Sequence, residues 1–295
     1  MMTKSEQARR AYAAEIKATA NIRSHALIEA FAQVPREQFL GPGPWKVIFA
    51  DPEKAGALNY RTTETADPEE IYHNVLVAID SERQLNNGQP TAIAVWADCL
   101  DLKPGIKVFH LGCGTGYYTA ILAHVAGARG KVTAVEVDPA LAGLAIDNLR
   151  GYSNVAVLHA DGANFDPGET DAMLINAGVS FVKRKWLERL TVGGTLVVPF
   201  TMTATPPSPP SAPGMGYMFK ITKAAEDKHP ARAISSVGIF PCTSARDAEA
   251  DVSLRKLLST KPITAVTCVR VDKHEISGTC AVHTAESCLS CEPLG

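Results

Sequence analysis

Between Lys107 and Phe200, short apolar segments alternate with amphipathic segments, and this alternation restricts the fold more than any other feature of the chain. The apolar segments have the length and composition of strands, and the segments between them have the period of helices. The strand segments are KVFHL, KVTAVEV, NVAVLHA, DAMLINA and GTLVVPF. Near-continuous apolar strands linked by helices form a parallel sheet that is covered on both faces. The expected fold class is therefore α/β, with a Rossmann-like doubly wound sheet.

Segments outside this core predict further elements. Two N-terminal helices are expected within residues 5–33, with Ser24 as the N-cap of the second. The short strand NVLVAI precedes a helix that begins at Pro90. GYMFKIT and ARAISSVGIF look like antiparallel strands, and they are followed by a helix over 247–259 and a strand in PITAVTCVRV. The sheet should be mostly parallel, with an antiparallel strand near its C-terminal end, and the proline-rich residues 203–214 should form a surface loop.

The composition is that of a soluble globular protein. The chain has 295 residues, of which 46% are hydrophobic, and its formal charge of −2 gives no electrostatic reason to expect a nucleic acid or an anionic membrane as partner. No apolar run approaches the roughly 18 residues of a membrane-spanning helix. The segment MMTKSEQARRAYAAE has no apolar core like that of a signal peptide. The seven scattered cysteines do not resemble a secreted disulfide framework. These features favour a cytoplasmic enzyme with reduced thiols.

The first strand of the core runs into the loop LGCGTGYYTA, which has glycines at 112, 114 and 116. Glycine lets a backbone turn sharply and approach a ligand closely, and the helix that follows offers free N-terminal amides. The dinucleotide fingerprint G-x-G-x-x-G would need a glycine at position 117, where Tyr117 stands. A glycine loop alone is weak evidence, because tight strand-to-helix turns also use glycine for packing.

Acidic residues at the ends of the next two strands strengthen this evidence. Glu136 ends KVTAVEV, 24 residues beyond Gly112, where a carboxylate can accept hydrogen bonds from both ribose hydroxyls. Asp161 and Gly162 follow NVAVLHA, where an aspartate can accept a hydrogen bond from the adenine amine. A plain turn or cap is the alternative for Asp161. The pattern predicts an adenosine ligand with a free ribose, which leaves NAD and S-adenosylmethionine open.

From about Ala30 to Thr201 the chain resembles the class I S-adenosylmethionine-dependent methyltransferases, and specifically the protein-L-isoaspartate O-methyltransferase family. The resemblance rests on VPREQF, GQP, LKPG, LGCGTGYYTAILA, VEVD, NL, DG and GGTLVVPF. It implies an enzyme with S-adenosyl-L-methionine as cofactor, and Tyr117 argues against the alternative of an NAD-dependent oxidoreductase. The cofactor-binding residues that it implies are His110, Gly112, Cys113, Gly114, Gly116, Tyr117, Glu136, Val137, Asp161, Gly162 and Asn176.

The same resemblance implies a role for each part of this set. The loop of residues 112–116 would wrap the methionine part of the cofactor, and Glu136 would hold the ribose. Asp161 and Gly162 would lie at the adenine. Asn176, which ends the strand DAMLINA, would face the site of methyl transfer.

Two positions depart from the family pattern. The family usually has an acidic residue two positions before the first loop glycine, and this chain has His110 there. A neutral imidazole supplies no charge, and a satisfied core histidine is the alternative role. The family's Thr-Ile-Ser-Gln-Pro is replaced by Asn86-Asn87-Gly88-Gln89-Pro90, so the serine hydroxyl beside the acceptor is missing. A plain Asn-Gly turn is the alternative interpretation of this segment.

The residues that would meet the methyl acceptor are less constrained. A carboxylate acceptor is already ionised at pH 7, whereas a hydroxyl or amine acceptor needs a base. His73, with Asp80 behind it, is the first candidate base, and Asn87 is the second catalytic candidate; a solvated loop position is the alternative for His73. Trp45 and Tyr60 could wall the pocket. The predicted substrate-binding residues are Tyr72, Asn86, Asn87, Gly88 and Gln89.

The expected acceptor differs from that of the family. The polar segment 47–85, the proline-rich insertion and the C-terminal extension favour methyl transfer to an oxygen or nitrogen of a small molecule. The alternatives are protein-L-isoaspartate carboxyl O-methylation, which is a protein-repair activity, and a non-catalytic cofactor-binding module. The expected segments are an N-terminal helical cap with the acceptor side (1–89), the cofactor-binding core (90–202), the proline-rich loop with antiparallel strands (203–245) and a C-terminal helix and strand extension (246–295).

The C-terminal segment TCAVHTAESCLSC has its own pattern, C-x2-H-x4-C-x2-C, formed by Cys280, His283, Cys288 and Cys291. Thiolates and imidazole at close spacing can bind zinc tetrahedrally. The order of these residues matches no established zinc module, and cysteine is often a small core residue. The sequence therefore favours packed or strand-borne thiols, with no metal bound.

Overall fold

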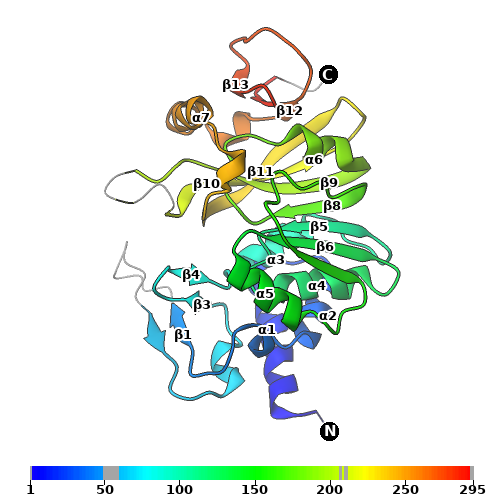
Figure 1. Ribbon diagram of the computed structural model, residues 1–295, viewed down its shortest axis with the longest axis vertical. Helices are drawn as coiled ribbons and strands as arrows, with labels where there is room; N and C mark the ends of the chain where they lie inside the picture. The colour runs from blue at the N-terminus through cyan, green and yellow to red at the C-terminus, as the bar shows by residue number, and fades with distance from the viewer. Residues whose placement is uncertain (1, 49–59, 206–207, 209–211, 293–295) are drawn as a thin grey trace. The chain divides into compact units, whose positions relative to one another are not determined.

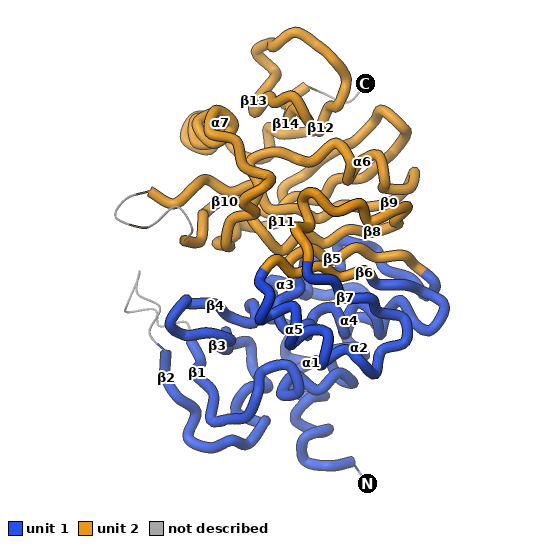
Figure 2. Tube along the Cα trace, viewed as in Figure 1, with its two compact units in different colours: residues 1–105, 113–132, 138–159 blue, residues 106–112, 133–137, 160–295 orange. Residues whose placement is uncertain are grey.

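The computed structural model describes residues 2–48, 60–205, 208 and 212–292. Contacts within the chain divide it into two compact units, which Figure 2 shows in different colours. Unit 1 consists of residues 1–105, 113–132 and 138–159, and unit 2 consists of residues 106–112, 133–137 and 160–295. The labels of the elements follow Figure 1.

Unit 1 begins with two capped helices that pack against each other. Helix α1 (Lys4–Ala20) has a capping box, in which Thr3 and Glu6 satisfy each other's backbone amides. Helix α2 (His25–Gln33) begins after Ser24, whose hydroxyl accepts a hydrogen bond from the Leu27 amide, and this confirms the predicted N-cap. The other helices of this unit are η1 (Arg36–Phe39), η2 (Pro68–Ile71), α3 (Pro90–Asp98), α4 (Tyr117–Ala126) and α5 (Pro139–Asn148).

Unit 1 also contains a small antiparallel sheet with the strand order β2-β1-β3-β4. Only β3 was expected, from the segment NVLVAI. The others have two or three residues, which are too few to show the alternation of a strand. Residues 49–59, within the polar segment 47–85, lie outside the described part. The strands of unit 1 are β1 (Lys46–Ile48), β2 (Arg61–Thr62), β3 (Leu76–Asp80), β4 (Leu85–Asn86) and β7 (Val155–His159).

Unit 2 contains a large mixed sheet with the order β13-β14-β12-β11-β10-β9-β8-β5-β6. Strand β8 runs parallel to both β5 and β9, whereas the pairs β9–β10, β10–β11, β11–β12, β12–β14 and β14–β13 are antiparallel. The strands are β5 (Lys107–Leu111), β6 (Lys131–Glu136), β8 (Thr170–Ile175), β9 (Leu190–Thr201), β10 (Gly214–Thr222), β11 (His229–Ile239), β12 (Cys268–Arg270), β13 (Cys280–His283) and β14 (Cys288–Ser290). The helices are α6 (Arg184–Arg189), α7 (Ala248–Thr260), η3 (Thr243–Ala245) and η4 (Ile263–Ala265).

The predicted α/β class is confirmed, and so are the five core strands. The antiparallel part of the sheet is larger than expected, because β13 and β14 join the predicted strands β10, β11 and β12. In the proline-rich segment 203–214, residues 206–207 and 209–211 lie outside the described part. No helix among the described residues is both long enough and apolar enough to span a membrane.

The core of unit 2 holds the ends of its parallel strands in place. Phe109 on β5, Met173 on β8 and Trp186 on α6 are completely buried in one apolar cluster. Leu111 and Ile175, the last residues of β5 and β8, are in the same cluster and are partners in the strand register. The residues that directly follow these strands therefore start from fixed positions.

Candidate active site

The turn from β5 to α4 requires glycine because its backbone has positive φ angles and because it leaves no room for a Cβ atom. Gly112 has a φ of +76°, and a Cβ atom there would lie 3.0 Å from the carbonyl oxygen of Asn176. Gly116, the N-cap of α4, has a φ of +97°, and a Cβ atom there would lie 2.7 Å from the Leu149 side chain. Residues that have a side chain rarely adopt such positive φ angles. The predicted sharp turn is present, with Cys113 and Gly114 inside it.

His110 and Asn176 lie next to each other within unit 2. His110 on β5 is completely buried, and its Nε2 is 3.2 Å from Nδ2 of Asn176, just beyond β8. Because the amide nitrogen only donates, Nε2 of His110 accepts and the ring is neutral. Burial lowers the pKa of His110 to about 3, which also favours the neutral ring. The buried Oδ1 of Asn176 has no hydrogen-bond partner in the described part of the chain.

The buried neutral ring of His110 should make the protein sensitive to acid. The unfolded chain binds a proton at this residue near pH 6.5, whereas the folded chain binds one only near pH 3. The free energy of unfolding should therefore fall as pH decreases through this window, by up to about 1.4 kcal/mol per pH unit. We expect His110→Gln, which keeps an acceptor for Asn176, to show a shallower fall in urea unfolding. His124→Gln, on the exposed side of α4, is the control, and an equal slope in all three proteins would contradict this assignment.

The residues predicted at the ribose and the adenine lie at or just beyond strand ends: Glu136 ends β6, and Asp161 and Gly162 follow β7. Glu136 is buried at the end of β6, where its Oε1 accepts a hydrogen bond from the Val137 amide at 2.9 Å. The Val137 side chain is exposed. Gly162 has no room for a side chain, because a Cβ atom would lie 2.5 Å from Leu111. Glycine at this position therefore lets the turn pack directly against the side chains of Leu111 and Val135.

Asp161 uses its carboxylate within its own turn. Its Oδ1 accepts a hydrogen bond from the Ala163 amide at 3.0 Å, and its Oδ2 accepts one from Nδ2 of Asn164 at 2.7 Å. This is the turn role that the sequence left open as an alternative. A contact with adenine would have to use the remaining lone pairs of these oxygens.

Arg36 organises the acceptor-side segment of unit 1, and sequence reasoning did not identify it. Its guanidinium is completely buried and donates to the carbonyl oxygens of Ile71 and Val75, both at 2.8 Å. It also donates to Oδ1 of Asn87 at 3.3 Å and lies over the ring of Tyr12. The available signal was the position of this arginine inside VPREQF, which was used only as a mark of resemblance. Arg36 joins residues 71–75 to the segment that contains Asn87.

The segment Asn86–Gln89 has a fixed backbone at its centre. Asn87 is buried, and its amide oxygen is the one that Arg36 contacts. Gly88 has a φ of +88°, and the hydroxyl of Tyr118 donates to its carbonyl oxygen at 3.0 Å. A Cβ atom at Gly88 would lie 3.2 Å from the Tyr118 ring, so the family's serine does not fit this conformation without a shift. The side chain of Gln89 is exposed.

The other predicted acceptor-side residues divide between surface and core. Tyr60 and Asn86 are together, because the tyrosine hydroxyl donates to the asparagine Oδ1 at 2.8 Å. The side chain of His73 is 59% exposed, with Nδ1 3.6 Å from a carboxylate oxygen of Glu15. The Asp80 carboxylate accepts from the amides of residues 82 and 83 and caps its own turn.

Three predicted aromatic residues are parts of the core of unit 1. Tyr72 is 2% exposed, and burial and the Glu37 carboxylate, to which its hydroxyl donates, raise its pKa. Trp45 is buried in the apolar cluster beneath the small sheet. Tyr117 is 1% exposed, and its ring packs against Phe39 with 5.6 Å between the ring centres. These rings therefore pack the interior of unit 1 and do not line a pocket in the structure described.

The sequence of this chain is similar to one family of known proteins. The family model for protein-L-isoaspartate(D-aspartate) O-methyltransferase (PCMT) matches residues 7–206. A protein-L-isoaspartate O-methyltransferase from Methanopyrus kandleri is 32% identical over 202 residues, which are 65% of this chain and 76% of that protein. One from Archaeoglobus fulgidus is 33% identical over 139 residues, which are 44% of this chain and 64% of that protein.

Solved structures show the same fold. A protein-L-isoaspartate O-methyltransferase structure superposes with a TM-score of 0.61 at 22% identity, covering 79% of this chain and 65% of its own. A Plasmodium falciparum structure, described as a beta-aspartate methyltransferase (PCMT) in complex with S-adenosyl-L-homocysteine, gives a TM-score of 0.57 at 16% identity. That match covers 79% of this chain and 97% of the other. At these identities the structures support the fold alone.

Proposed function

This chain belongs to the protein-L-isoaspartate O-methyltransferase family and is an S-adenosylmethionine-dependent methyltransferase, and on this premise we propose that it methylates a carboxylate of a peptide or protein, with the isoaspartyl carboxylate as the first candidate acceptor. The observation that carries the proposal is the extent of the family match. It covers residues 7–206, which include the segments around Arg36 and Gly88 as well as the glycine loop. The comparisons do not support the small-molecule acceptor that was expected from the sequence.

The residues present fit the cofactor. The positive φ angles of Gly112, Gly114 and Gly116 form the sharp turn that lets a backbone approach a ligand closely. The buried carboxylate of Glu136 can accept from a ribose diol, and the unpartnered Oδ1 of Asn176 can accept from a donor such as an ammonium group. When bound, S-adenosylmethionine supplies an activated methyl group on a sulfonium. The proposed cofactor-binding residues remain the predicted set, with Tyr117 contributing through its backbone.

A carboxylate acceptor suits the side chains on the acceptor side. An ionised carboxylate attacks the methyl group directly, so the protein has to position it and exclude water but has no proton to remove. The amide side chains of Asn86 and Gln89 can donate hydrogen bonds to a carboxylate oxygen. Because Gly88 replaces the family's serine, one hydroxyl donor is missing, and we expect slower transfer than the family pattern would give.

The test compares acceptors that differ in one feature. The full chain is incubated with methyl-labelled S-adenosylmethionine and either an isoaspartyl peptide, its aspartyl isomer or a small dicarboxylic acid. We expect base-labile methyl esters on the isoaspartyl peptide, formed at least about tenfold faster than on the other two acceptors. Faster esterification of the free dicarboxylic acid would contradict the peptide acceptor. Label that resists base in every assay would contradict the carboxylate.

A further inference from the structure

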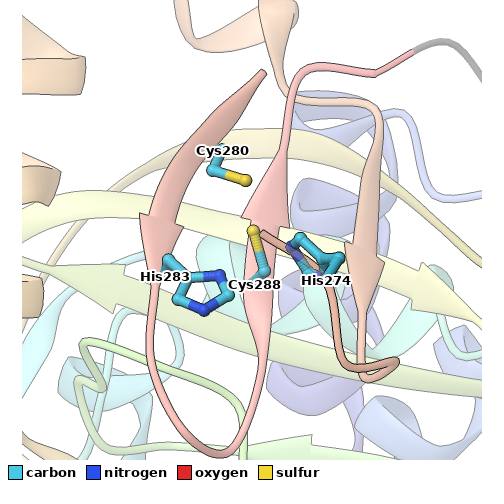
Figure 3. Close-up of side chains that lie close together, drawn as sticks. All are labelled: His274, Cys280, His283 and Cys288. Carbon is cyan, nitrogen blue, oxygen red and sulfur yellow. The ribbon is translucent and has the colours of Figure 1, made fainter. Parts of the chain in front are cut away.

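Four side chains that can bind metals gather at the C-terminal hairpin of unit 2. They are His274, Cys280, His283 and Cys288, which Figure 3 shows pointing toward one another. One nitrogen or sulfur atom from each residue lies within 4.8 Å of those from the other three. All four residues lie after residue 206, where the family match ends. The cluster therefore lies outside the part of the chain that matches the family.

The backbone explains how these residues reach the same place. His283 and Cys288 are direct partners in the antiparallel pair of β13 and β14. Residues three apart in a regular strand face opposite sides of the sheet, which would separate Cys280 from His283. The strand register shifts between Cys280 and Val282, and such a bulge adds one residue and can return both side chains to the same face. His274 comes from the connection between β12 and β13.

The two imidazole rings each present a nitrogen with no partner. His274 Nε2 and His283 Nδ1 are buried without a hydrogen bond among the described residues. The ring of His274 is 90% buried, since its side chain is 10% exposed. Its Nδ1 lies 2.9 Å from the carbonyl oxygen of Asp272, which can only accept, so Nδ1 carries the proton and Nε2 a lone pair. A metal-binding histidine is typically oriented in this way through its second nitrogen.

One of the two thiol groups accepts a hydrogen bond that favours metal binding. The backbone amide of Ser277 donates to the Sγ atom of Cys280 at 3.4 Å. The hydroxyl oxygen of Ser277 lies 3.7 Å from the same sulfur. Hydrogen-bond donors stabilise a thiolate, which is the form of cysteine that binds zinc.

We propose that His274, Cys280, His283 and Cys288 bind one Zn²⁺ ion as a structural site. Two thiolates and two imidazoles form a closed tetrahedral set that leaves no position for a substrate. Zinc bonds of about 2.0–2.3 Å place neighbouring ligand atoms roughly 3.3–3.8 Å apart, so the ion draws the four atoms somewhat closer together. This proposal replaces the sequence-based expectation that no metal is bound. The proposed ligand set contains His274 instead of Cys291, which was part of the sequence pattern.

The proposed ion would stabilise the edge of the mixed sheet. Strand β14 pairs with β12, and helix α7 packs against β13, so a fixed hairpin also supports these two elements. The strands β12 and β14 have only three residues each, and a two-stranded hairpin alone is marginally stable. A metal bound by the hairpin and by His274 in the β12–β13 connection would cross-link these two segments.

The test is metal analysis of the full chain, purified without a histidine tag or chelator. We expect about one zinc ion per chain, and after exchange with Co²⁺ the visible absorption bands of a tetrahedral site together with thiolate-to-cobalt charge transfer. Cys280→Ser and His274→Asn should each lose the metal. Cys291→Ser removes a nearby thiol outside the cluster and should keep it, so it is the matched control.

The outcomes are distinguishable even where a variant fails to fold, because the wild-type chain provides its own measurement. The absence of zinc together with the absence of cobalt bands in the reduced wild-type chain would overturn the proposal. A Cys280–Cys288 disulfide trapped in freshly extracted protein would also overturn it, as would metal that depends on Cys291 but not on His274. X-ray absorption showing two sulfur and two nitrogen neighbours would support it directly.

Discussion

Replacing Arg36 with methionine should destabilise the protein by about 3 kcal/mol or more. The guanidinium is completely buried, and its partners are the neutral carbonyl oxygens of Ile71, His73 and Val75 and the amide oxygen of Asn87. Methionine preserves most of the volume but leaves these oxygens without a donor, and each buried unsatisfied acceptor costs about 1–3 kcal/mol. Urea unfolding measures the loss.

An exposed arginine is the matched control for this change. Arg23 is 69% exposed and pairs with Asp98 at 3.1 Å, so Arg23→Met should cost less than about 1 kcal/mol. Because Arg36 also holds Asn87 and residues 71–75, the fraction of Arg36→Met that remains folded should show a raised KM for the acceptor, with cofactor affinity nearly unchanged. Equal stability of the two variants would show that Arg36 does not organise this segment.

Replacing Glu136 with glutamine should weaken cofactor binding by roughly ten- to a hundredfold. The two side chains have the same shape, and the amide oxygen can still accept from the Val137 amide. The lost charge weakens the hydrogen bonds from the two ribose hydroxyls, and bonds to charged groups contribute about 1.5–3 kcal/mol each. Calorimetric titration with S-adenosylhomocysteine measures the change in Kd.

Glu169→Gln is the control for the loss of one negative charge. Glu169 is 70% exposed and pairs with Lys107 at the start of β5, so its replacement should leave the Kd unchanged. Equal weakening by both variants would point to a general effect of charge and would remove Glu136 from the site.

The core of the fold and the order of its site residues could be predicted because long elements have a clear period. The strands β5, β6 and β8 have five or six residues with near-continuous apolar character. The expected site residue Glu136 ends β6, and the expected residues Gly112 and Asn176 directly follow β5 and β8. The glycine loop was also predictable, since Gly112 and Gly116 have the positive φ angles that only glycine adopts readily.

Features that depend on tertiary contacts could not be predicted. The burial of Arg36 follows from carbonyl groups some 35 to 39 residues away, for which local sequence has no signal. Tyr72 and Trp45 were expected to line a pocket, but aromatic side chains both line pockets and pack in cores. In the structure both residues are buried in the core. Local sequence also gives no signal for the bulge between Cys280 and Val282. The sequence pattern therefore includes Cys291, whereas the structure places His274 in the cluster.

We propose that the ends of β5, β6 and β8 and the glycine loop bind S-adenosylmethionine. Calorimetric titration of the wild-type chain with S-adenosylhomocysteine, followed by the same titration with NAD, measures this most directly. We expect saturable heat with one site per chain for S-adenosylhomocysteine and none for NAD. No heat with S-adenosylhomocysteine, or saturable binding of NAD that competes with it, would contradict this proposal.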